Sequence, residues 1–198
     1  MKDKDVALTC ILLDDNHDRR SLLNRSMCEF GFDILSTIVN SNELLATVEK
    51  HPCDFLIIGV DLPSKQLLDS LKFIHKHNPK PVIMFAEKDT PQIIQKTVES
   101  GVNAYIVDDL QPKRLSTIIN VAMARFEQHQ NLLQELNDTK DKLEQRKILD
   151  KAKGILMQQK NITEQDAYAL IRKMAMDKGE KLEKVAQKII DVFSMLGE

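Results

Sequence analysis

Short apolar runs alternate with amphipathic stretches through the first 110 residues, and no other feature constrains the fold as strongly. The apolar runs are mostly continuous, as expected for parallel strands that are covered on both faces. The stretches between them carry apolar residues at three- and four-residue spacing, which is typical of helices. This order predicts an α/β domain with a doubly wound five-stranded parallel sheet. The expected strands are Val6–Leu13, Ile34–Val39, Phe55–Val60, Val82–Phe85 and Ala104–Val107, and the expected helices are Arg19–Phe30, Glu43–Lys50, Gln66–His75 and Pro91–Glu99. Gly31 and Gly101 stand where two of these helices should end.

A fifth helix should begin at Pro112, and from Leu115 no proline or glycine interrupts it before Gly154. A heptad pattern runs along it, which predicts a coiled-coil helix that pairs two copies in parallel. The alternative is that the apolar stripe packs against its own domain. The expected a positions are Ile119, Phe126 and Leu133, continued by Lys140 and Lys147, and the expected d positions are Ala122, His129, Leu136 and Leu143.

Two shorter helices follow. Thr163 is a suitable N-cap with Asp166 three residues later, and Gly179 should end that helix. Together with the end of the long helix they predict a small all-α three-helix bundle. Its expected core is Ile148, Ala152, Ile155, Leu156, Ala167, Leu170, Ile171, Met174, Leu182, Val185, Ala186, Ile189 and Phe193.

Length and composition set further limits. The 198 residues suit one ordinary domain and a small one, which we expect at residues 1–125 and 148–196 with a coiled-coil linker at 115–150. A net charge of −2 excludes a uniformly basic nucleic-acid coat. No signal peptide or membrane span is apparent, which predicts a cytoplasmic protein. Three cysteines in apolar runs, Cys10, Cys28 and Cys53, are expected to be buried thiols.

The C-terminal residues resemble the ANTAR domain along its whole length. The resemblance rests on Ala152-Lys153-Gly154-Ile155-Leu156-Met157, Ala167-Tyr168, Leu170-Ile171-Arg172-Lys173-Met174-Ala175-Met176, Leu182 and Val185-Ala186. ANTAR domains are RNA-binding antitermination modules. The order of receiver, coiled coil and ANTAR is similar to that of the amidase-operon and nitrate-assimilation antiterminator regulators, and the endings LIRKMAMDKGEKL and AYIVDDL look most like the nitrate type.

The chemistry of this segment agrees with RNA binding. Lys153, Arg172 and Lys173 can supply donors to phosphates. Gly154 is costly inside a helix, and either close helix packing or close approach of an RNA backbone would explain it. Tyr168 can stack on an unpaired base, or it can be a half-buried tyrosine with a wet hydroxyl. A rival reading is a DNA-binding helix-turn-helix in which Lys184, Gln187 and Lys188 face the groove.

The first domain resembles the response regulator receiver over residues 6 to about 125. Receivers hold Mg²⁺ with an acidic pair, matched here by Asp14 and Asp15, and phosphorylate an aspartate at the end of the third strand. Registering that strand on Asp54 and Pro63 places Gly59 at the acceptor position. The expected hydroxyl is replaced by Ala86, and the expected lysine is replaced by Asp108.

The resemblance therefore implies a receiver without its phosphorylation chemistry, and Asp61 is the nearest substitute acceptor. Asp14, Asp15 and Asp108 lack an evident compensating cation and should repel one another. We expect them to stay solvated, with weak binding of a divalent cation by Asp14 and Asp15 as the alternative. No cofactor is expected, and no nucleophile–base pair, metal-ligand spacing or phosphate loop indicates an enzyme.

Together these features predict a non-catalytic transcription antitermination regulator that binds stem-loops in leader mRNA and prevents a terminator hairpin. The resemblance implies control by a ligand-sensing protein of the periplasmic-binding fold, with the coiled coil forming a homodimer. Two alternatives stay open. One is a phosphorylation-controlled regulator with an unusual acceptor, and the other is a coiled-coil interaction scaffold that never binds nucleic acid.

Overall fold

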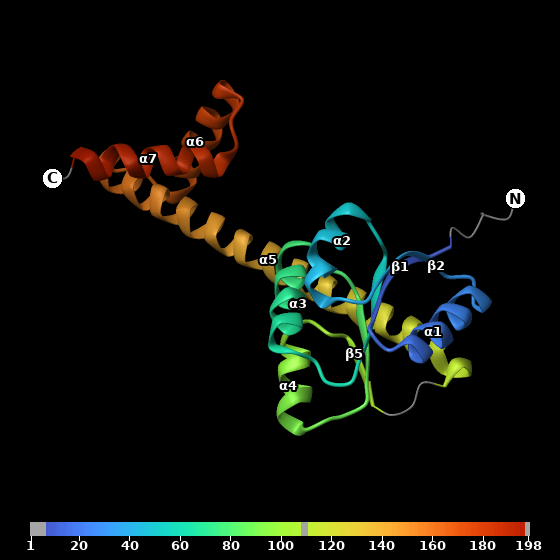
Figure 1. The fold of residues 1–198 in the computed structure, drawn as a ribbon. Helices are drawn as coiled ribbons and strands as arrows, with labels where there is room; N and C mark the ends of the chain where they lie inside the picture. Colours follow the sequence, from blue (N-terminus) through green and yellow to red (C-terminus); the bar gives the residue numbers. More distant parts are fainter. Residues whose placement is uncertain (1–6, 108–110, 197–198) are drawn as a thin grey trace, which may run out of the picture. The chain divides into compact units, whose positions relative to one another are not determined.

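The computed structural model describes residues 7–107 and 111–196 (Figure 1). They form two compact units, of which the first ends at Gln130 and the second begins at Asn131. One helix, α5, Pro112–Lys160, contributes residues to both.

A five-stranded parallel sheet forms the centre of the N-terminal unit, with the strand order β2-β1-β3-β4-β5. This order confirms the predicted doubly wound sheet. The strands are β1 Thr9–Asp14, β2 Asp33–Ile38, β3 Phe55–Val60, β4 Val82–Ala86 and β5 Ala104–Val107. The predicted bounds of β3 and β5 are correct, whereas β1 begins at Thr9 and Val6 lies outside the described residues.

The helices between the strands begin and end close to their predicted bounds. Gly31 and Gly101 follow two of them with φ of +78° and +90°, which confirms both as helix ends. The helices are α1 His17–Glu29, α2 Leu44–Lys50 after a short 3-10 turn η1 at Ser41–Glu43, α3 Lys65–His77 and α4 Pro91–Glu99.

Apolar side chains of the sheet pack on both faces. On one face the strands pack against α2 and α3, through Leu44, Val48, Leu67 and Leu71. On the other they pack against α1 and the first turns of α5 (Figure 1). Because helices cover both faces of the sheet, side chains on both sides of the central strands are apolar, and these strands appear in the sequence as continuous apolar runs.

The first heptad of the predicted coiled coil belongs to this core. Ile119 and Ala122 are fully buried among residues of the N-terminal unit. The assignment of these two positions to an intermolecular seam was therefore wrong, because they pack against their own sheet. Farther along α5, Leu132, Leu133, Leu136 and Leu143 are 39% to 57% exposed. Of the expected seam positions, Phe126 is half-buried, whereas His129, Leu133, Leu136 and Leu143 are exposed.

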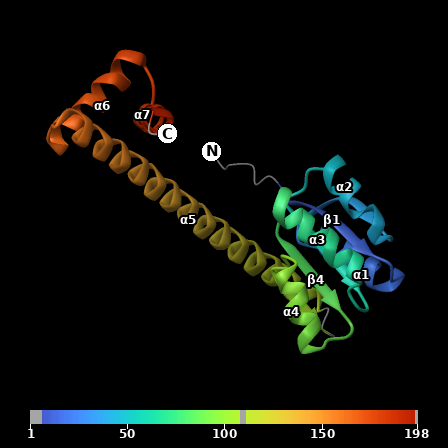
Figure 2. The ribbon, with the colours of Figure 1, turned by 90° about the vertical axis from the view of Figure 1, so that its left-hand side faces the viewer.

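The C-terminal unit is the expected helical bundle, formed by the end of α5 with α6 Glu164–Lys178 and α7 Leu182–Leu196 (Figure 2). Thr163 caps α6 by accepting a hydrogen bond from the Asp166 amide, and Gly179 ends it in a left-handed conformation. Nine side chains are buried in the core, Ala152, Leu156, Ala167, Ile171, Ala175, Val185, Ala186, Ile189 and Ile190.

The cysteines differ from the prediction at one position. Cys10 and Cys53 are buried, but Cys28 is exposed because it lies on the outer side of α1. Burial, followed by the nearby thiol of Cys53, raises the pKa of Cys10 to about 12, so this thiol stays protonated and unreactive. Within the described ranges, no helix has the length and apolar character needed to cross a membrane.

Candidate functional site

The register of the sheet brings the predicted receiver residues to one edge. Asp14 at the end of β1 pairs with Gly59 of β3, and the next residue of β3, Val60, pairs with Ala86 at the end of β4. These three positions therefore lie together, as expected from the carboxyl ends of parallel strands. Asp108, the fourth predicted member, lies outside the described residues.

Gly59 leaves space that the side chain of Asp14 fills. A Cβ atom at position 59 would lie 2.0 Å from Asp14 Oδ2 and 2.8 Å from Arg19 Nε. Real Cβ contacts are never this short, so any other residue would require Asp14 to move. Asp14 is fully buried and both of its carboxylate oxygens accept hydrogen bonds from Arg19, so moving it would break those bonds. The Asp14 side chain can therefore occupy its observed position only because residue 59 has no side chain.

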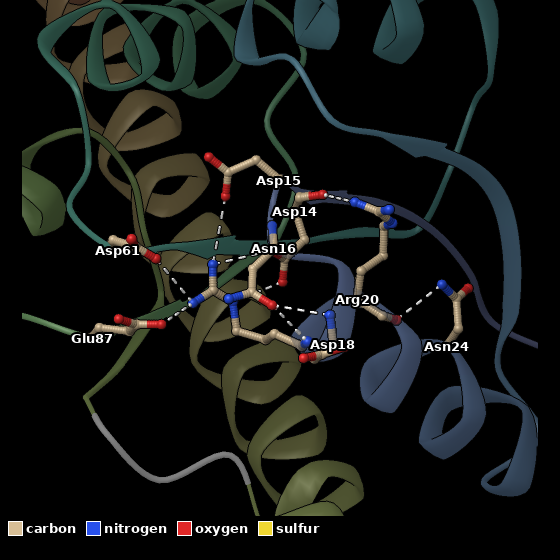
Figure 3. A network of polar contacts seen from close by, with 9 residues as sticks. Asp14, Asp15, Asn16, Asp18, Arg20, Asn24, Asp61 and Glu87 are labelled. Carbon is tan, nitrogen blue, oxygen red and sulfur yellow. Dashed lines mark hydrogen bonds and ion pairs between the residues drawn. The ribbon is translucent and has the colours of Figure 1, made fainter.

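Arg19 of α1 binds the carboxylates at this edge. Its Nε donates to Asp14 Oδ2 at 2.8 Å and its Nη2 donates to Asp14 Oδ1 at 3.0 Å. Its Nη1 reaches Glu87 Oε1 at 3.0 Å and Asp61 Oδ1 at 3.4 Å, and its Nη2 lies 3.7 Å from Asp15 Oδ1. Figure 3 shows Asp14, Asp15, Asp61 and Glu87 directed toward this common centre. The expectation of a solvated carboxylate without a compensating cation was therefore wrong for Asp14, whereas the Asp15 side chain is 71% exposed to solvent as expected.

The start of α1 explains how Arg19 reaches the cluster. Asn16 caps the helix, accepting hydrogen bonds from the Asp18 and Arg19 amides, and its own amide donates to Asp14 Oδ1 at 2.9 Å. The helix therefore begins directly beside the end of β1, and its first turn carries Arg19 over the sheet edge. Arg20 adds a hydrogen bond from Nη1 to the Asp14 carbonyl oxygen at 2.8 Å.

These contacts keep the guanidinium of Arg19 protonated. Burial alone would lower the pKa of Arg19, but the hydrogen bond and charge of Asp14, and then those of Asp61, raise it above its ordinary value. Arg19 is therefore a permanent cation with a side chain that is only 11% exposed. Asp61, the predicted substitute acceptor, is one of its ion-pair partners.

The edge does not fit the Mg²⁺ that receivers hold. Both carboxylate oxygens of Asp14 are engaged by Arg19, and Gly59 contributes no oxygen ligand from a side chain. In the described part of the chain, no three His, Cys, Asp or Glu side chains are arranged to hold a metal ion. A cavity of about 440 Å³ beside Gly59 and Asp15 has no basic side chain in its lining, so it does not suit a phosphate either.

In the C-terminal bundle, one face of α6 is exposed and carries two basic side chains. We call this the α6 outer face, formed by Gln165, Tyr168, Ala169, Arg172, Lys173 and Met176. The three- and four-residue spacing places them on one side of the helix. Arg172 and Lys173 make no hydrogen bond or ion pair with the described residues, and Tyr168 is 41% exposed. The face therefore offers two unpaired cations beside an exposed aromatic ring.

Lys153 lies in a different environment from Arg172 and Lys173. Its Nζ is 2.7 Å from Asp150 Oδ1 and 2.6 Å from Glu164 Oε1, and its side chain is 14% exposed. The hydrogen bonds to Asp150 and then Glu164 raise its pKa. Lys153 therefore ties the end of α5 to the first turn of α6, one turn before Tyr168.

Gly154 faces open space. A Cβ atom at this position would have no heavy atom within 4 Å. Close packing inside the bundle was one of two explanations for a glycine in this helix, and the neighbours of Gly154 do not require it.

Two of the three residues expected to contact DNA in a helix-turn-helix are bound to acidic side chains of the bundle. Lys188 Nζ binds Glu180 at 2.6 and 2.7 Å, and Gln187 Nε2 donates to Asp191 at 2.7 Å. Of the three residues named for that reading, only Lys184 carries no side-chain hydrogen bond or ion pair among the described residues. Among the described residues, α6 thus carries Arg172 and Lys173 without side-chain partners, whereas of the two lysines of α7 only Lys184 is without one.

Comparison with known families agrees with this architecture. The response regulator receiver domain matches residues 10–120, more than half of the chain, and the ANTAR domain matches residues 137–190. The chain belongs to the response regulator receiver family and carries an ANTAR domain. Both are regulatory domains and point to a non-enzymatic regulator. Because ANTAR domains are RNA-binding antitermination modules, the assignment supports an RNA-binding antitermination regulator.

Two relatives share parts of this organisation. The transcriptional regulatory protein PdtaR of Mycobacterium tuberculosis is 25% identical over 189 residues, which cover 96% of this chain and 92% of PdtaR. The nitrate regulatory protein of Klebsiella oxytoca is 40% identical over 63 residues, which cover 32% of this chain and 16% of that protein. The similarity to PdtaR therefore extends over the receiver domain, the long helix and the ANTAR domain.

Solved structures show the same receiver fold. The signal receiver domain of a modulated diguanylate cyclase from Desulfovibrio desulfuricans G20 aligns with a TM-score of 0.56 at 13% identity, covering 63% of this chain and 99% of that one. A CheY-like receiver domain protein from Methanospirillum hungatei JF-1 aligns with a TM-score of 0.55 at 18% identity, with the same coverage of both chains.

Sequence reasoning missed Arg19. A signal was present, because Arg19 follows Asp15 by four residues at the start of a helix that begins directly after the acidic pair. An arginine in the first turn of such a helix lies close to the acids that precede the helix, and its charge favours an ion pair with them. Its reach to Asp61 and Glu87 depends on the sheet register and is not visible in the sequence.

Proposed function

We propose that this protein is a transcription antitermination regulator whose ANTAR domain binds stem-loops in leader mRNA and prevents a terminator hairpin. The α6 outer face carries this proposal. Arg172 and Lys173 are exposed cations without partners among the described residues, and Tyr168 beside Arg172 offers a ring on which an unpaired base can stack. A folded RNA presents both phosphates and unstacked loop bases, so one helix face can contact both.

The roles within this surface differ. Arg172 and Lys173 would contact phosphates, Arg172 through its bidentate fork. Lys153 would position the surface, because its two ion pairs join α5 to the start of α6. Gly154 lies in the next position of α5 and would allow an RNA backbone to approach the helix closely.

A binding experiment tests the α6 outer face. Arg172→Ala should weaken binding to a two-hairpin leader RNA by about tenfold, equal to about 1.4 kcal/mol, and should reduce the salt dependence of binding. A gel-shift titration at several salt concentrations measures both. Lys184→Ala is the matched control, because this exposed α7 cation is unpaired among the described residues. An equal loss of affinity in both variants would indicate nonspecific electrostatic attraction to RNA. Unchanged affinity in Arg172→Ala would show that the α6 outer face is not the RNA-binding site.

A substitution at Gly154 separates stability from binding. Gly154→Ala should stabilise the ANTAR domain by about 1 kcal/mol, because alanine favours the helix and the site has space for its methyl group. The same methyl group should weaken RNA binding if the backbone approaches there. Urea denaturation and the gel shift measure the two effects, with Gln159→Ala, an exposed position of the same helix, as the control. Increased stability with unchanged affinity would place Gly154 outside the interface.

For control of the protein, we propose a ligand-sensing partner of the periplasmic-binding fold instead of phosphorylation. Two features argue against phosphorylation: position 59 has no side chain to accept a phosphoryl group, and Asp61 is paired with Arg19. The class of partner rests on the resemblance to the amidase-operon and nitrate-assimilation regulators. A pull-down from lysate with and without candidate small molecules should recover a partner whose association changes with the ligand. Recovery of a histidine kinase alone, with Mg²⁺-dependent labelling by acetyl phosphate, would support the phosphorylated alternative.

The functional unit is proposed to be a homodimer. Leu133, Leu136 and Leu143 keep the predicted heptad spacing, and they are exposed in the single chain. Pairing two copies of this segment would bury them and would present two ANTAR domains to two stem-loops.

A further inference from the structure

We infer that the Arg19 guanidinium is a built-in replacement for the divalent cation of the receiver site. It neutralises an acidic cluster, which we define as Asp14, Asp15, Asp61 and Glu87, and so leaves the receiver with no use for the metal. This inference is independent of the RNA proposal, because it concerns the receiver alone.

The charges show why a cation is needed. Four carboxylates face a common centre, and one of them, Asp14, is fully buried. A buried carboxylate without a partner is strongly disfavoured, and like charges at this spacing repel one another. In a metal-binding receiver a divalent ion meets this need. Here the guanidinium of Arg19 binds Asp14 through two donors, at 2.8 and 3.0 Å.

The geometry of the guanidinium suits this role better than a lysine would. Its planar fork engages both oxygens of Asp14 while the remaining nitrogen reaches outward to Glu87 and Asp61. These partners follow three different strands. Asp14 ends β1, Asp61 comes directly after β3, and Glu87 comes directly after β4. Arg19 therefore links the carboxyl ends of β1, β3 and β4 through their acidic side chains, a role that a bound cation would otherwise have.

The absence of a side chain at Gly59 allows Asp14 and Arg19 to form their ion pair at this point. Asp14 Oδ2 lies only 2.0 Å from the point where a Cβ atom of residue 59 would be, and Arg19 Nε lies 2.8 Å from the same point. The carboxylate thus turns toward the space of the missing acceptor side chain, and Arg19 follows it. No oxygen of Asp14 is left without a hydrogen-bond donor, since Oδ1 also accepts from the Asn16 amide.

Binding of Mn²⁺ to the full-length protein tests this inference. Electron paramagnetic resonance counts bound Mn²⁺, and thermal unfolding with and without Mn²⁺ reports on the receiver. The wild type should bind no Mn²⁺ at the acidic cluster and should keep its melting temperature. Arg19→Met should melt at a lower temperature, should regain stability when Mn²⁺ is added, and should bind Mn²⁺ saturably at a concentration at which the wild type binds none.

Two variants serve as controls. Arg25→Met removes the same charge from an exposed position of α1 and should not gain Mn²⁺ binding. Arg19→Lys keeps a cation at the acidic cluster and should gain less Mn²⁺ binding than Arg19→Met. Saturable Mn²⁺ binding to the wild type that disappears in Asp14→Asn would overturn the inference, and this arm needs no folded Arg19 variant. A folded Arg19→Met protein that responds to Mn²⁺ no more than Arg25→Met would also overturn it.

Discussion

Gly59→Asp should destabilise the receiver domain and should not turn it into a phosphoryl acceptor. The new Cβ atom would lie 2.0 Å from Asp14 Oδ2, and the new carboxylate would add a fifth negative charge to a partly buried cluster. Crowding and disturbance of the buried ion pair should cost about 2–4 kcal/mol in the free energy of unfolding. Urea denaturation measures the loss, and incubation with labelled acetyl phosphate and Mg²⁺ should leave the variant unlabelled.

Two further variants separate the causes. Gly59→Ala adds only the Cβ atom and should show most of the destabilisation. Thr37→Asp adds a carboxylate at an exposed position of β2 and should show little of it. Wild-type stability of Gly59→Asp, or labelling that requires Mg²⁺, would show that Asp14 and Arg19 rearrange easily.

Substitution of two leucines of the long helix should separate the proposed dimer. Leu133→Lys combined with Leu136→Lys places charges at neighbouring a and d positions of the seam, where apolar side chains are needed. Each chain contributes both positions, so the dissociation constant should rise at least about a hundredfold, equal to about 2.7 kcal/mol. Sedimentation equilibrium measures the change, and circular dichroism checks that both domains stay folded.

Asn131→Lys combined with Gln134→Lys provides the matched control. It adds the same charge to the same helix at positions outside the seam, and it should leave the association unchanged. A monomeric wild type would contradict the proposed dimer directly. A double leucine variant that stays dimeric would instead show that the two copies meet elsewhere.

The fold could be predicted from the sequence because the receiver buries both faces of its sheet. That burial makes Phe55–Val60 and Ala104–Val107 continuous apolar runs between turns, and both were predicted with correct bounds. The start of α5 at Pro112 was also predicted, since proline is favoured in the first turn of a helix. The seam was misjudged because an apolar stripe does not reveal its partner. Ile119 and Ala122 meet their own sheet, whereas Leu133 and Leu136 do not.

The candidate sites were predicted in part. The resemblance to receivers assigned Gly59 to the acceptor position, and the sheet register places it beside Asp14 at the carboxyl edge of the strands. The ion pairs of Arg19 and Lys153 were not foreseen, because they join residues through the register of strands and the packing of helices. Arg172 and Lys173 stay predicted RNA contacts, and the exposure of their helix face is consistent with that role.

The contact between Asp14 and the empty side of Gly59 also bears on how such a receiver changes over generations. An aspartate at position 59 alone would force the buried Asp14 carboxylate out of place while Arg19 still holds it. Loss of Arg19 alone would leave the four carboxylates without their shared counter-charge. Positions 19 and 59 are therefore expected to change together in related sequences and not one at a time.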